Sequence, residues 1–407
     1  MKDIIKGRRL ARFTLIAGLI GLLLTVACTT TPTSQERANV VAFGNITPLT
    51  GPASASEQLG FQGIEDYIRY FNETESIPGV TIKHSWIDTG FVVSNAIGAY
   101  HKFVARGVPI LHSTHTEALP GIVDKLEKDG VPLITPLQSE YLFYPPGWSY
   151  GITPTYAEIF TVLADYIMEN WKEERPPKLA FMGSDTEFTW SPVAEGTKYA
   201  ESIGIEMLPT EIVAHVPLDT TTQLMRLKER GADFIYIQMI PVVAAPILRD
   251  AERLGLLDEI QFCGTTYSAG DTLINKAGTA TEGYLAPFGT PWWDETEIPG
   301  IKLMTDIQMK YHGKVNRDPE TFEWVTAAVG CEAIKRAIEN VGYENLDGRV
   351  VKDALDSMKD FDVYGVATIS YTPADHRGSN KIVIYQIKDG KLVRVSDWRE
   401  APMLIPD

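Results

Sequence analysis

Short apolar runs of strand length alternate with longer stretches that have helical spacing, beginning at Asn39. A strand is expected at 40–46, and a turn rich in proline leads from it to a helix at 58–71. A second strand at 80–87 and a helix at 94–106 follow in the same way. Strands and helices that alternate along a chain are typical of parallel sheets covered by helices. The pattern therefore predicts an α/β protein.

The stretch 107–142 contains the same unit twice. Gly-Val-Pro, a few apolar residues and then polar side chains occur at 107–116 and again at 130–139, with a helical pattern between them. This arrangement predicts a βαβ unit whose strands end on one edge of a sheet. Ligands of open α/β sheets bind beyond this edge, so we expect a ligand there. The hydroxyl side chains at the two expected strand ends are Ser113, Thr114, Thr116, Thr135 and Ser139.

A second alternation begins near Ile152 and predicts a second lobe. Its expected helices are 155–173, 192–203, 221–230 and 243–254, and its expected strands are 178–182, 206–213, 234–239 and 261–264. Prolines and the pair Trp292–Trp293 interrupt the pattern after Gly283. Helices are then expected at 300–311, 321–340 and 347–358, and a strand pair at 381–387 and 391–395. Two such series in tandem predict two doubly wound parallel-sheet lobes.

The amino terminus has the composition of an export signal. Basic residues up to Arg12 precede an apolar run at 13–26 that is too short to cross a membrane comfortably. Cys28 follows three small residues and precedes a polar tether. This pattern resembles a bacterial lipoprotein signal, which implies a signal peptide at 1–27 and a tether at 28–38 that is lipidated on Cys28. A plain signal peptide followed by an incidental cysteine stays open as the alternative.

Composition and charge restrict the class of protein. The 407 residues are 44% hydrophobic and 22% charged, which is typical of a soluble globular protein with room for two domains. The net charge is −16, and loss of 1–27, with five positive charges and one negative, leaves −20. A protein with this much negative charge repels nucleic acid. We therefore expect no nucleic-acid partner. Cys263 and Cys331 lie in separate apolar segments and are expected to be buried free thiols.

Motifs of catalysis, cofactor binding and metal binding are absent from the sequence. It has no GxSxG, HExxH or GxxxxGK[ST] motif and no GxGxxG linked to a strand. His112 and His115 have no acidic or thiol partner close by in sequence, whereas metal sites need three or four ligands. We therefore expect no enzymatic activity, no cofactor and no metal.

Several segments occur in the order and spacing of one known family. They are Gly51-Pro52 after the first strand, Asp88 after the second, the doubled Gly-Val-Pro unit, and 232–256, which runs from Ala-Asp-Phe-Ile-Tyr to Arg-Leu-Gly-Leu. Over nearly its whole length beyond the tether, the chain resembles type I periplasmic binding proteins of the leucine/isoleucine/valine family. The resemblance implies a receptor of an ABC importer that closes two lobes over a small solute and delivers it to a permease. Such a receptor is exported and works as a monomer in the periplasm or on the cell surface.

The resemblance also implies where the lobes and their connections lie. Lobe 1 would consist of 39–152 and 290–362, and lobe 2 of 153–289 and 363–407. Three hinge crossings would fall near 150–156, 284–292 and 362–371. A ligand sensor of the same fold that signals to a membrane partner remains the alternative function, because one fold serves both purposes.

The ligand-binding residues are carried over by position. On lobe 1, His115 and Thr116, the backbone of Leu137, and Ser139 would hold a carboxylate. Ordinary helix capping by Thr116 and Ser139 is the alternative. On lobe 2 the matching positions are Phe188, Trp190, Ile240, Thr266 and Tyr267. The pair Trp292–Trp293 is either a hinge contact or a stacking surface.

The position of Thr266 leads to an expectation about the ligand. Family members that bind α-amino acids carry an acidic residue there, opposite the ammonium group. A buried ammonium without a carboxylate is unfavourable, so we expect the ligand to be a carboxylate, an amide or an aromatic acid rather than a plain α-amino acid. Asp271, five residues further on, is the one residue expected to be able to replace the missing charge.

Overall fold

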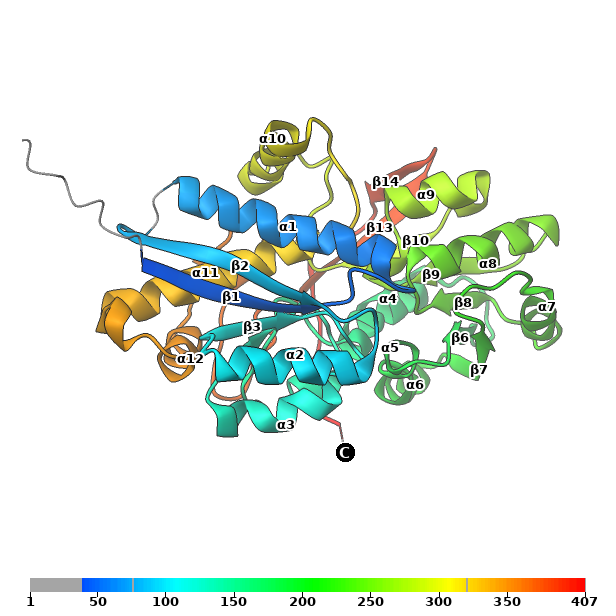
Figure 1. Cartoon of the computed structure of the whole chain (residues 1–407). Helices are drawn as coiled ribbons and strands as arrows, with labels where there is room; N and C mark the ends of the chain where they lie inside the picture. Colours follow the sequence, from blue (N-terminus) through cyan, green and yellow to red (C-terminus); the bar gives the residue numbers. More distant parts are fainter. Residues whose placement is uncertain (1–38, 75–76, 320, 407) are drawn as a thin grey trace, which may run out of the picture. The chain divides into compact units, whose positions relative to one another are not determined.

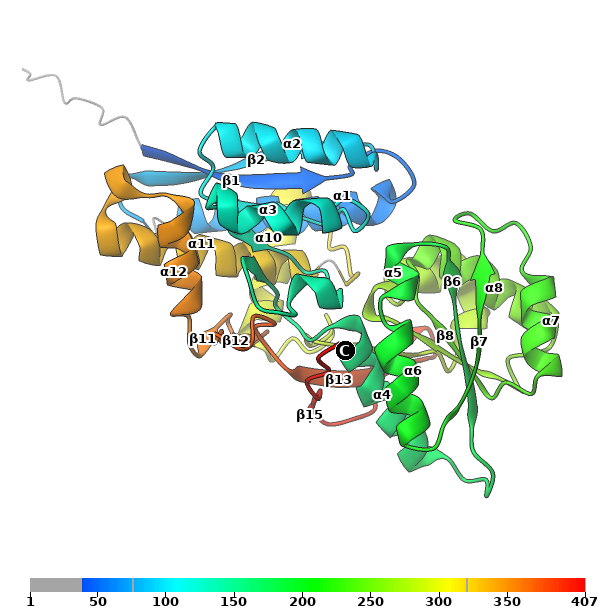
Figure 2. The same cartoon turned by 90° about the horizontal axis from the view of Figure 1, so that it is seen from below.

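The structure is a computed structural model that describes residues 39–74, 77–319 and 321–406. Cys28 and the expected signal peptide and tether lie outside the described residues. The described chain contains two α/β lobes, each built around its own sheet, and Figures 1 and 2 show them from two directions. The two-lobed α/β fold expected from the sequence is confirmed.

The first sheet is parallel throughout, with the strand order β2-β1-β3-β4-β5. Its strands are β1 (Asn39–Thr47), β2 (Val80–Asp88), β3 (Ile110–Ser113), β4 (Leu133–Ile134) and β5 (Ser149–Tyr150). Its helices are α1 (Ser54–Glu73), α2 (Val93–Ala105), α3 (Pro120–Asp129), α10 (Pro299–His312), α11 (Thr321–Val341) and α12 (Gly348–Asp356). In Figure 1, α1 and α11 cover one face of this sheet, and α2 and α3 cover the other.

Side chains that alternate along each strand explain why both faces of this sheet carry helices. Phe43 and Ile110 pack in the core formed with α1 and α11, whereas Leu111 packs in the core formed with α2 and α3. Successive strand residues point to opposite faces, so an almost continuous apolar strand needs cover on both sides. Gly330 of α11 allows a close approach to β1, because a Cβ there would lie 2.4 Å from the ring of Phe43.

The second sheet has the strand order β14-β13-β10-β9-β8-β6-β7, and β15 also pairs with β13. Its parallel strands are β6 (Lys178–Ser184), β7 (Glu206–Val213), β8 (Phe234–Ile237), β9 (Gln261–Gly264) and β10 (Leu285–Phe288). The antiparallel strands are β13 (Lys381–Lys388), β14 (Lys391–Arg394) and β15 (Arg399–Glu400). Its helices are α4 (Tyr156–Asn170), α5 (Glu187–Trp190), α6 (Val193–Ser202), α7 (Thr221–Glu229), α8 (Pro241–Arg253) and α9 (Asp271–Ala277).

The chain passes between the lobes three times, as expected. It crosses between β5 and α4, between β10 and α10, and after the two-stranded sheet of β11 (Phe361–Asp362) and β12 (Thr368–Ile369). The second crossing runs further than expected, to Pro299, and the third follows Ile369 and runs beside the first. The Tyr371 hydroxyl donates to the Gly151 carbonyl oxygen over 2.7 Å, which ties these two crossings together.

Trp292 and Trp293 are hinge contacts in the second crossing. Trp292 is 2% exposed and packs against Phe288, with ring centroids 5.5 Å apart. The indole nitrogen of Trp293 donates to the Asp318 carbonyl oxygen over 3.2 Å. Tight packing of both rings supports their role as hinge residues rather than as a stacking surface for a ligand.

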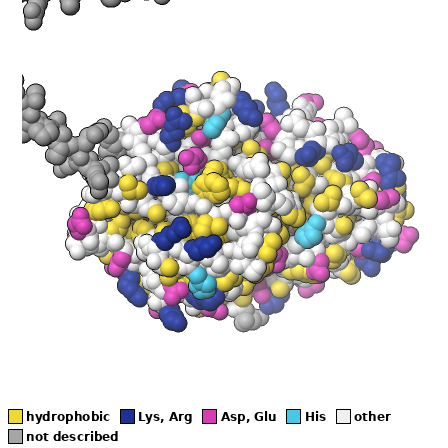
Figure 3. Space-filling model, viewed as in Figure 1, with side chains coloured by type: hydrophobic (Ala, Val, Ile, Leu, Met, Phe, Trp, Pro, Cys, Tyr) yellow, Lys and Arg dark blue, Asp and Glu magenta, His cyan; other side chains and the backbone are white. Residues whose placement is uncertain are grey.

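The surface and the thiols agree with the composition. Charged side chains of both signs and hydrophobic side chains are spread over the face seen in Figure 3. None of the helices in the described ranges is long and apolar enough to cross a membrane. Cys263 and Cys331 are buried and free, as expected.

Candidate functional site

A cavity of about 130 Å³ lies where the strand ends of both sheets face each other. From lobe 1 it receives the segments that follow β1, β2, β3 and β4, and from lobe 2 those that follow β6, β7, β8 and β9. This is the carboxyl edge at which open α/β sheets bind ligands. Its wall includes Ser56, Glu57, Phe91, Thr114, Thr116, Glu117, Leu137, Tyr156, Thr186, Phe188, His215, Met239, Ile240, Val243, Tyr267 and Glu323.

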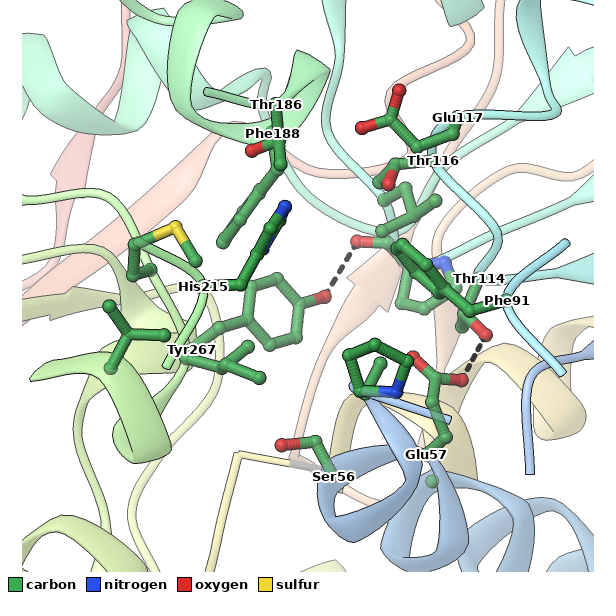
Figure 4. Close-up of a pocket in the computed structure, with 18 of the residues that line it drawn as sticks. Ser56, Glu57, Phe91, Thr114, Thr116, Glu117, Thr186, Phe188, His215 and Tyr267 are labelled. Atoms are coloured by element: carbon green, nitrogen blue, oxygen red, sulfur yellow. Dashed lines mark hydrogen bonds between the residues drawn. The ribbon is translucent and has the colours of Figure 1, made fainter. Parts of the chain in front are cut away.

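The lobe 2 wall is mainly apolar and aromatic. Figure 4 shows Phe188, His215 and Tyr267 on one side of the cavity, opposite Glu57, Phe91 and Thr114. The Phe188 ring stands at 71° to the Tyr156 ring, with centroids 5.1 Å apart, so the wall is held by edge-to-face packing. Such a wall favours an apolar part of a ligand.

Tyr267 connects the two lobes at the cavity. Its hydroxyl donates to the Pro136 carbonyl oxygen over 2.8 Å, and a dashed line marks this bond in Figure 4. Tyr267 follows β9 in lobe 2, and Pro136 follows β4 in lobe 1. The position of the Tyr267 ring therefore depends on how the two lobes meet.

The lobe 1 wall is acidic. Glu57 lies in the first turn of α1, where its Oε2 accepts hydrogen bonds from the hydroxyl of Thr114 and, over 3.4 Å, from that of Thr47. Burial raises the pKa of Glu57 from 4.5 to about 8, and the nearby charge of Glu323 acts in the same direction. These surroundings therefore favour a protonated Glu57 at neutral pH.

Glu323 belongs to a chain of buried polar side chains that leads away from the cavity. Its Oε2 lies 2.7 Å from Nε2 of His112, and Nδ1 of His112 donates to Oδ1 of Asn45 over 2.9 Å. Nδ2 of Asn45 donates to Nε2 of His84 over 3.0 Å, and Nδ1 of His84 lies 2.6 Å from the exposed Glu65. Nε2 of His112 thus lies beside Oε2 of Glu323 inside the protein, although the geometry between the two atoms is not that of a hydrogen bond.

Five of the predicted ligand-binding residues line the cavity. They are Thr116, Leu137, Phe188, Ile240 and Tyr267. They come from different strand ends of both lobes, so the fold brings together side chains that are up to 151 positions apart in the sequence. Their contact with a ligand stays a prediction.

The other four predicted residues do not line the cavity. Thr266 is buried, and its hydroxyl donates to the Pro287 carbonyl oxygen of β10. Ser139 is buried and donates to Glu187 over 3.1 Å. Trp190 is 44% exposed and donates to Asp185 over 2.8 Å, and His115 is buried with its ring stacked on Phe91.

A local hydrogen bond or ring contact explains most of these departures. The Thr266 hydroxyl donates to the Pro287 carbonyl oxygen, and the Ser139 hydroxyl donates to the Glu187 carboxylate. A buried acceptor without a donor is unfavourable, so these bonds hold the two side chains in place. Asp271 does not replace Thr266, because it begins α9 and its Oδ2 lies 3.9 Å from Nε of Arg317, outside the cavity wall. The position of Thr266 therefore carries no argument about the charge of the ligand.

Four acidic or basic side chains of the cavity wall were not predicted from the sequence, namely Glu57, Glu117, His215 and Glu323. Glu57 had a signal, because it is the acidic residue in the first helical turn after the loop that contains Gly51-Pro52. His215 and Glu323 had none that we could have used. Glu323 reaches the cavity from α11, in a segment more than 250 positions after Glu57.

Two parallel-sheet lobes joined by three crossings, with a cavity between their carboxyl edges, define a two-lobed solute-binding protein. Residues 40–391 match the family described as periplasmic binding protein. The chain belongs to this family, whose members are solute-binding proteins rather than enzymes.

Relatives of known character agree with this assignment. The chain is 25% identical over 321 residues to the Leu/Ile/Val/Thr-binding protein of Salmonella typhimurium, covering 77% of this chain and 82% of the relative. Among solved structures, a branched chain amino acid ABC transporter from Thermus thermophilus with bound valine has a TM-score of 0.83 and 26% identity, covering 89% of this chain and 97% of that one.

A third comparison concerns the fold alone. A fatty acid ABC transporter substrate-binding protein from Thermomonospora curvata has a TM-score of 0.80 at 18% identity, covering 90% of this chain and 95% of that one. The same fold thus occurs in structures named for quite different ligands. The ligand of this chain has to be argued from its own cavity.

Proposed function

We propose that the protein is the solute receptor of an ABC importer, which binds one small solute in the cavity between its lobes and delivers it to a membrane permease. The observation that carries this proposal is the cavity itself, whose wall is built from the strand ends of both sheets. A solute in that position touches both lobes, so it favours the arrangement in which they are closed. Relatives named as amino-acid-binding proteins support the same function.

The moving bodies in this proposal are the two lobes, 39–152 with 290–362 and 153–289 with 363–407. The three crossings would serve as the hinge. We propose Thr116, Leu137, Phe188, Ile240 and Tyr267 as ligand contacts, because they line the cavity.

A thermal-shift screen of the mature protein against amino acids, amines, amides, urea and carboxylic acids tests this function. A solute that binds only the folded protein, at about 100 times its Kd, should stabilise it by about 2.7 kcal/mol. Ile240→Trp, which fills part of the cavity, should abolish the shift while the circular dichroism spectrum stays unchanged. Failure of every solute to shift the unfolding temperature, or a shift that persists in Ile240→Trp, would count against the proposal.

We also propose that the mature receptor is a monomer held at the outer face of a membrane by lipid on Cys28. The small residues before Cys28 and the polar tether after it support this anchor. Cys28→Ser should release the protein from the membrane fraction and leave solute binding intact. Membrane association that survives this substitution would show that the anchor lies elsewhere.

A further inference from the structure

The charges on the cavity wall are unbalanced. Glu57, Glu117 and Glu323 all line it, and none of the described lining residues is a lysine or arginine. The one basic side chain on the wall is His215, which enters from lobe 2. A wall of this kind is poorly suited to a carboxylate, because like charges repel one another strongly in a place that excludes water.

Two of these three carboxylates have a nitrogen of the chain close by. Glu323 lies 2.7 Å from His112, and Oε1 of Glu117 accepts from the backbone N–H of Glu187 over 3.1 Å. Glu57 is different, because its donors among the described residues are the hydroxyls of Thr47 and Thr114, both to Oε2. Within the described part of the chain, Glu57 takes part in no ion pair.

An ionised carboxylate in this position needs a cation that the described residues do not supply. Removing an ionised group from water is unfavourable unless it is paired and hydrogen-bonded. Without a cation beside it, Glu57 reaches neutrality by holding a proton, which agrees with its raised pKa. A positively charged nitrogen placed beside it would replace that proton and leave the carboxylate ionised.

Two of the expected carboxylate donors of lobe 1 are already used within the protein, whereas Thr116 lines the cavity. The Ser139 hydroxyl donates to Glu187, and the backbone N–H of Leu137 donates to the Thr135 hydroxyl over 3.1 Å. The opposite wall offers mainly apolar surface from Phe188, Met239, Ile240, Val243 and Tyr267. The cavity of about 130 Å³ is close in size to cavities of about 150 Å³ that hold benzene.

We infer that the solute is a hydrophobic amine or a similar cation without a carboxylate, whose charged nitrogen pairs with Glu57 while its apolar body packs against the lobe 2 wall. This inference rests on the proposed function and names its ligand class. It places the ligand's positive charge on lobe 1, whereas the resemblance implies a carboxylate there. It also replaces the expectation of an acid or amide that was based on Thr266.

A matched set of three compounds tests this inference. Leucine, 3-methylbutylamine and 4-methylpentanoate share one apolar body and differ only in their charged groups. Calorimetry at about pH 8.5 should show the amine binding at least about tenfold more tightly than the acid. Phenylalanine, 2-phenylethylamine and 3-phenylpropanoate repeat the comparison with a ring that suits the aromatic wall.

The variant Glu57→Gln isolates the charge. It should weaken binding of the amine by about tenfold to a hundredfold, because a charge-assisted bond is replaced by a neutral one, and change binding of the acid much less. Glu127→Gln is the matched control, since it removes the same charge from an exposed position on α3 of lobe 1. Circular dichroism checks that both variants are folded.

The pH dependence of the wild-type protein gives a second measurement that needs no variant. Affinity for the amine should rise as the pH increases towards about 8, because Glu57 has to lose a proton for binding. The other titratable groups near Glu57 are Glu323 with His112, Glu117 and His215. For a carboxylate ligand the dependence has the opposite sign, because protonated Glu57 would donate to it.

The failures of the two proposals can be told apart. Tighter binding of leucine or the acid than of the amine, with no effect of Glu57→Gln, would overturn the inference and leave the receptor function standing. Binding of another solute class in the thermal-shift screen, with no binding of any amine, would do the same. No binding of any compound in the screen would overturn both.

Discussion

Two carboxylates of this protein, the fully buried Glu158 and the half-buried Glu57, have different partners. Glu158, at the start of α4 beside the first crossing, is fully buried, and its Oε2 lies 2.9 Å from Nη1 of Arg377 in the third crossing. The Tyr144 hydroxyl and the backbone N–H of Leu404 also donate to Glu158, over 2.6 and 2.8 Å. Among the described residues, the donors to Glu57 in the cavity are hydroxyls.

The difference distinguishes a structural carboxylate from one that we assign to ligand binding. Around Glu158 the chain supplies a cation and several donors, so the charge is satisfied whether or not a ligand is present. Around Glu57 the residues that the structure describes supply no lysine or arginine, and the carboxylate faces a cavity. The partner of Glu57 is therefore expected to come and go with the ligand.

The largest effect is expected when the cation is removed from the structural carboxylate. Arg377→Met should destabilise the protein by about 3 to 5 kcal/mol, because Glu158 is left buried and charged without its partner. Urea denaturation of the unliganded protein measures this change. The matched control is Arg399→Met, which breaks the more exposed pair with Glu169 and should cost at most about 1 kcal/mol. Equal effects of the two substitutions would remove the distinction drawn for Glu158.

The second effect concerns the stability of the unliganded protein as the pH changes. Folding raises the pKa of Glu57 from 4.5 to about 8, so the folded protein holds this proton more tightly than the unfolded chain does. The stability that the proton gives to the folded state is fully present below pH 4.5 and is lost as the pH rises through about 8. Glu57→Gln should remove this loss, making the variant about 1 to 3 kcal/mol more stable than the wild type near pH 8.5, after allowance for screening by water in the cavity.

Unfolding curves of both proteins between about pH 5 and 8.5 provide the measurement. Glu140 and Glu187, whose pKa values burial raises to about 7, contribute a loss of the same sign in both proteins, so only the difference between them reports on Glu57. A constant difference across this pH range would contradict the environment assigned to Glu57.

A smaller effect is expected at the contact between the lobes. Tyr267→Phe removes the hydrogen bond to the Pro136 carbonyl oxygen and should weaken solute binding by about 0.5 to 1.5 kcal/mol, about twofold to tenfold. Calorimetry with the tightest solute from the screen measures this loss. Tyr199→Phe, which removes a hydroxyl bound to Asp165 outside the cavity wall, is the control and should leave affinity unchanged.

The pattern of apolar residues predicted the fold well. The βαβ unit predicted from the doubled Gly-Val-Pro stretch corresponds to β3, α3 and β4. The strand predicted at 261–264 is β9, with the same bounds. The strand β10 was missed because Pro287 interrupts its pattern, yet β9 and β13 pair with it on either side. This segment is a strand because it pairs with neighbouring strands, and the local pattern of residues does not show such pairing.

The binding site was predicted only where the strand ends alone determine it. Thr116, Phe188 and Tyr267 follow expected strands directly, and each lines the cavity. Thr266 and Ser139 also follow strands, but hydrogen bonds to Pro287 and Glu187 hold their side chains elsewhere. Which way a side chain turns within a loop depends on distant partners that neighbouring residues in the sequence do not reveal.

The central claim is that Glu57 exchanges its proton for the charged nitrogen of the solute, and counting protons tests it most directly. Calorimetry of 3-methylbutylamine binding, in buffers of different ionisation enthalpy at about pH 7, gives the number of protons released. We predict release of about one proton by the wild type and close to none by Glu57→Gln. Binding by the wild type with no proton released, or with a proton taken up, would contradict the account.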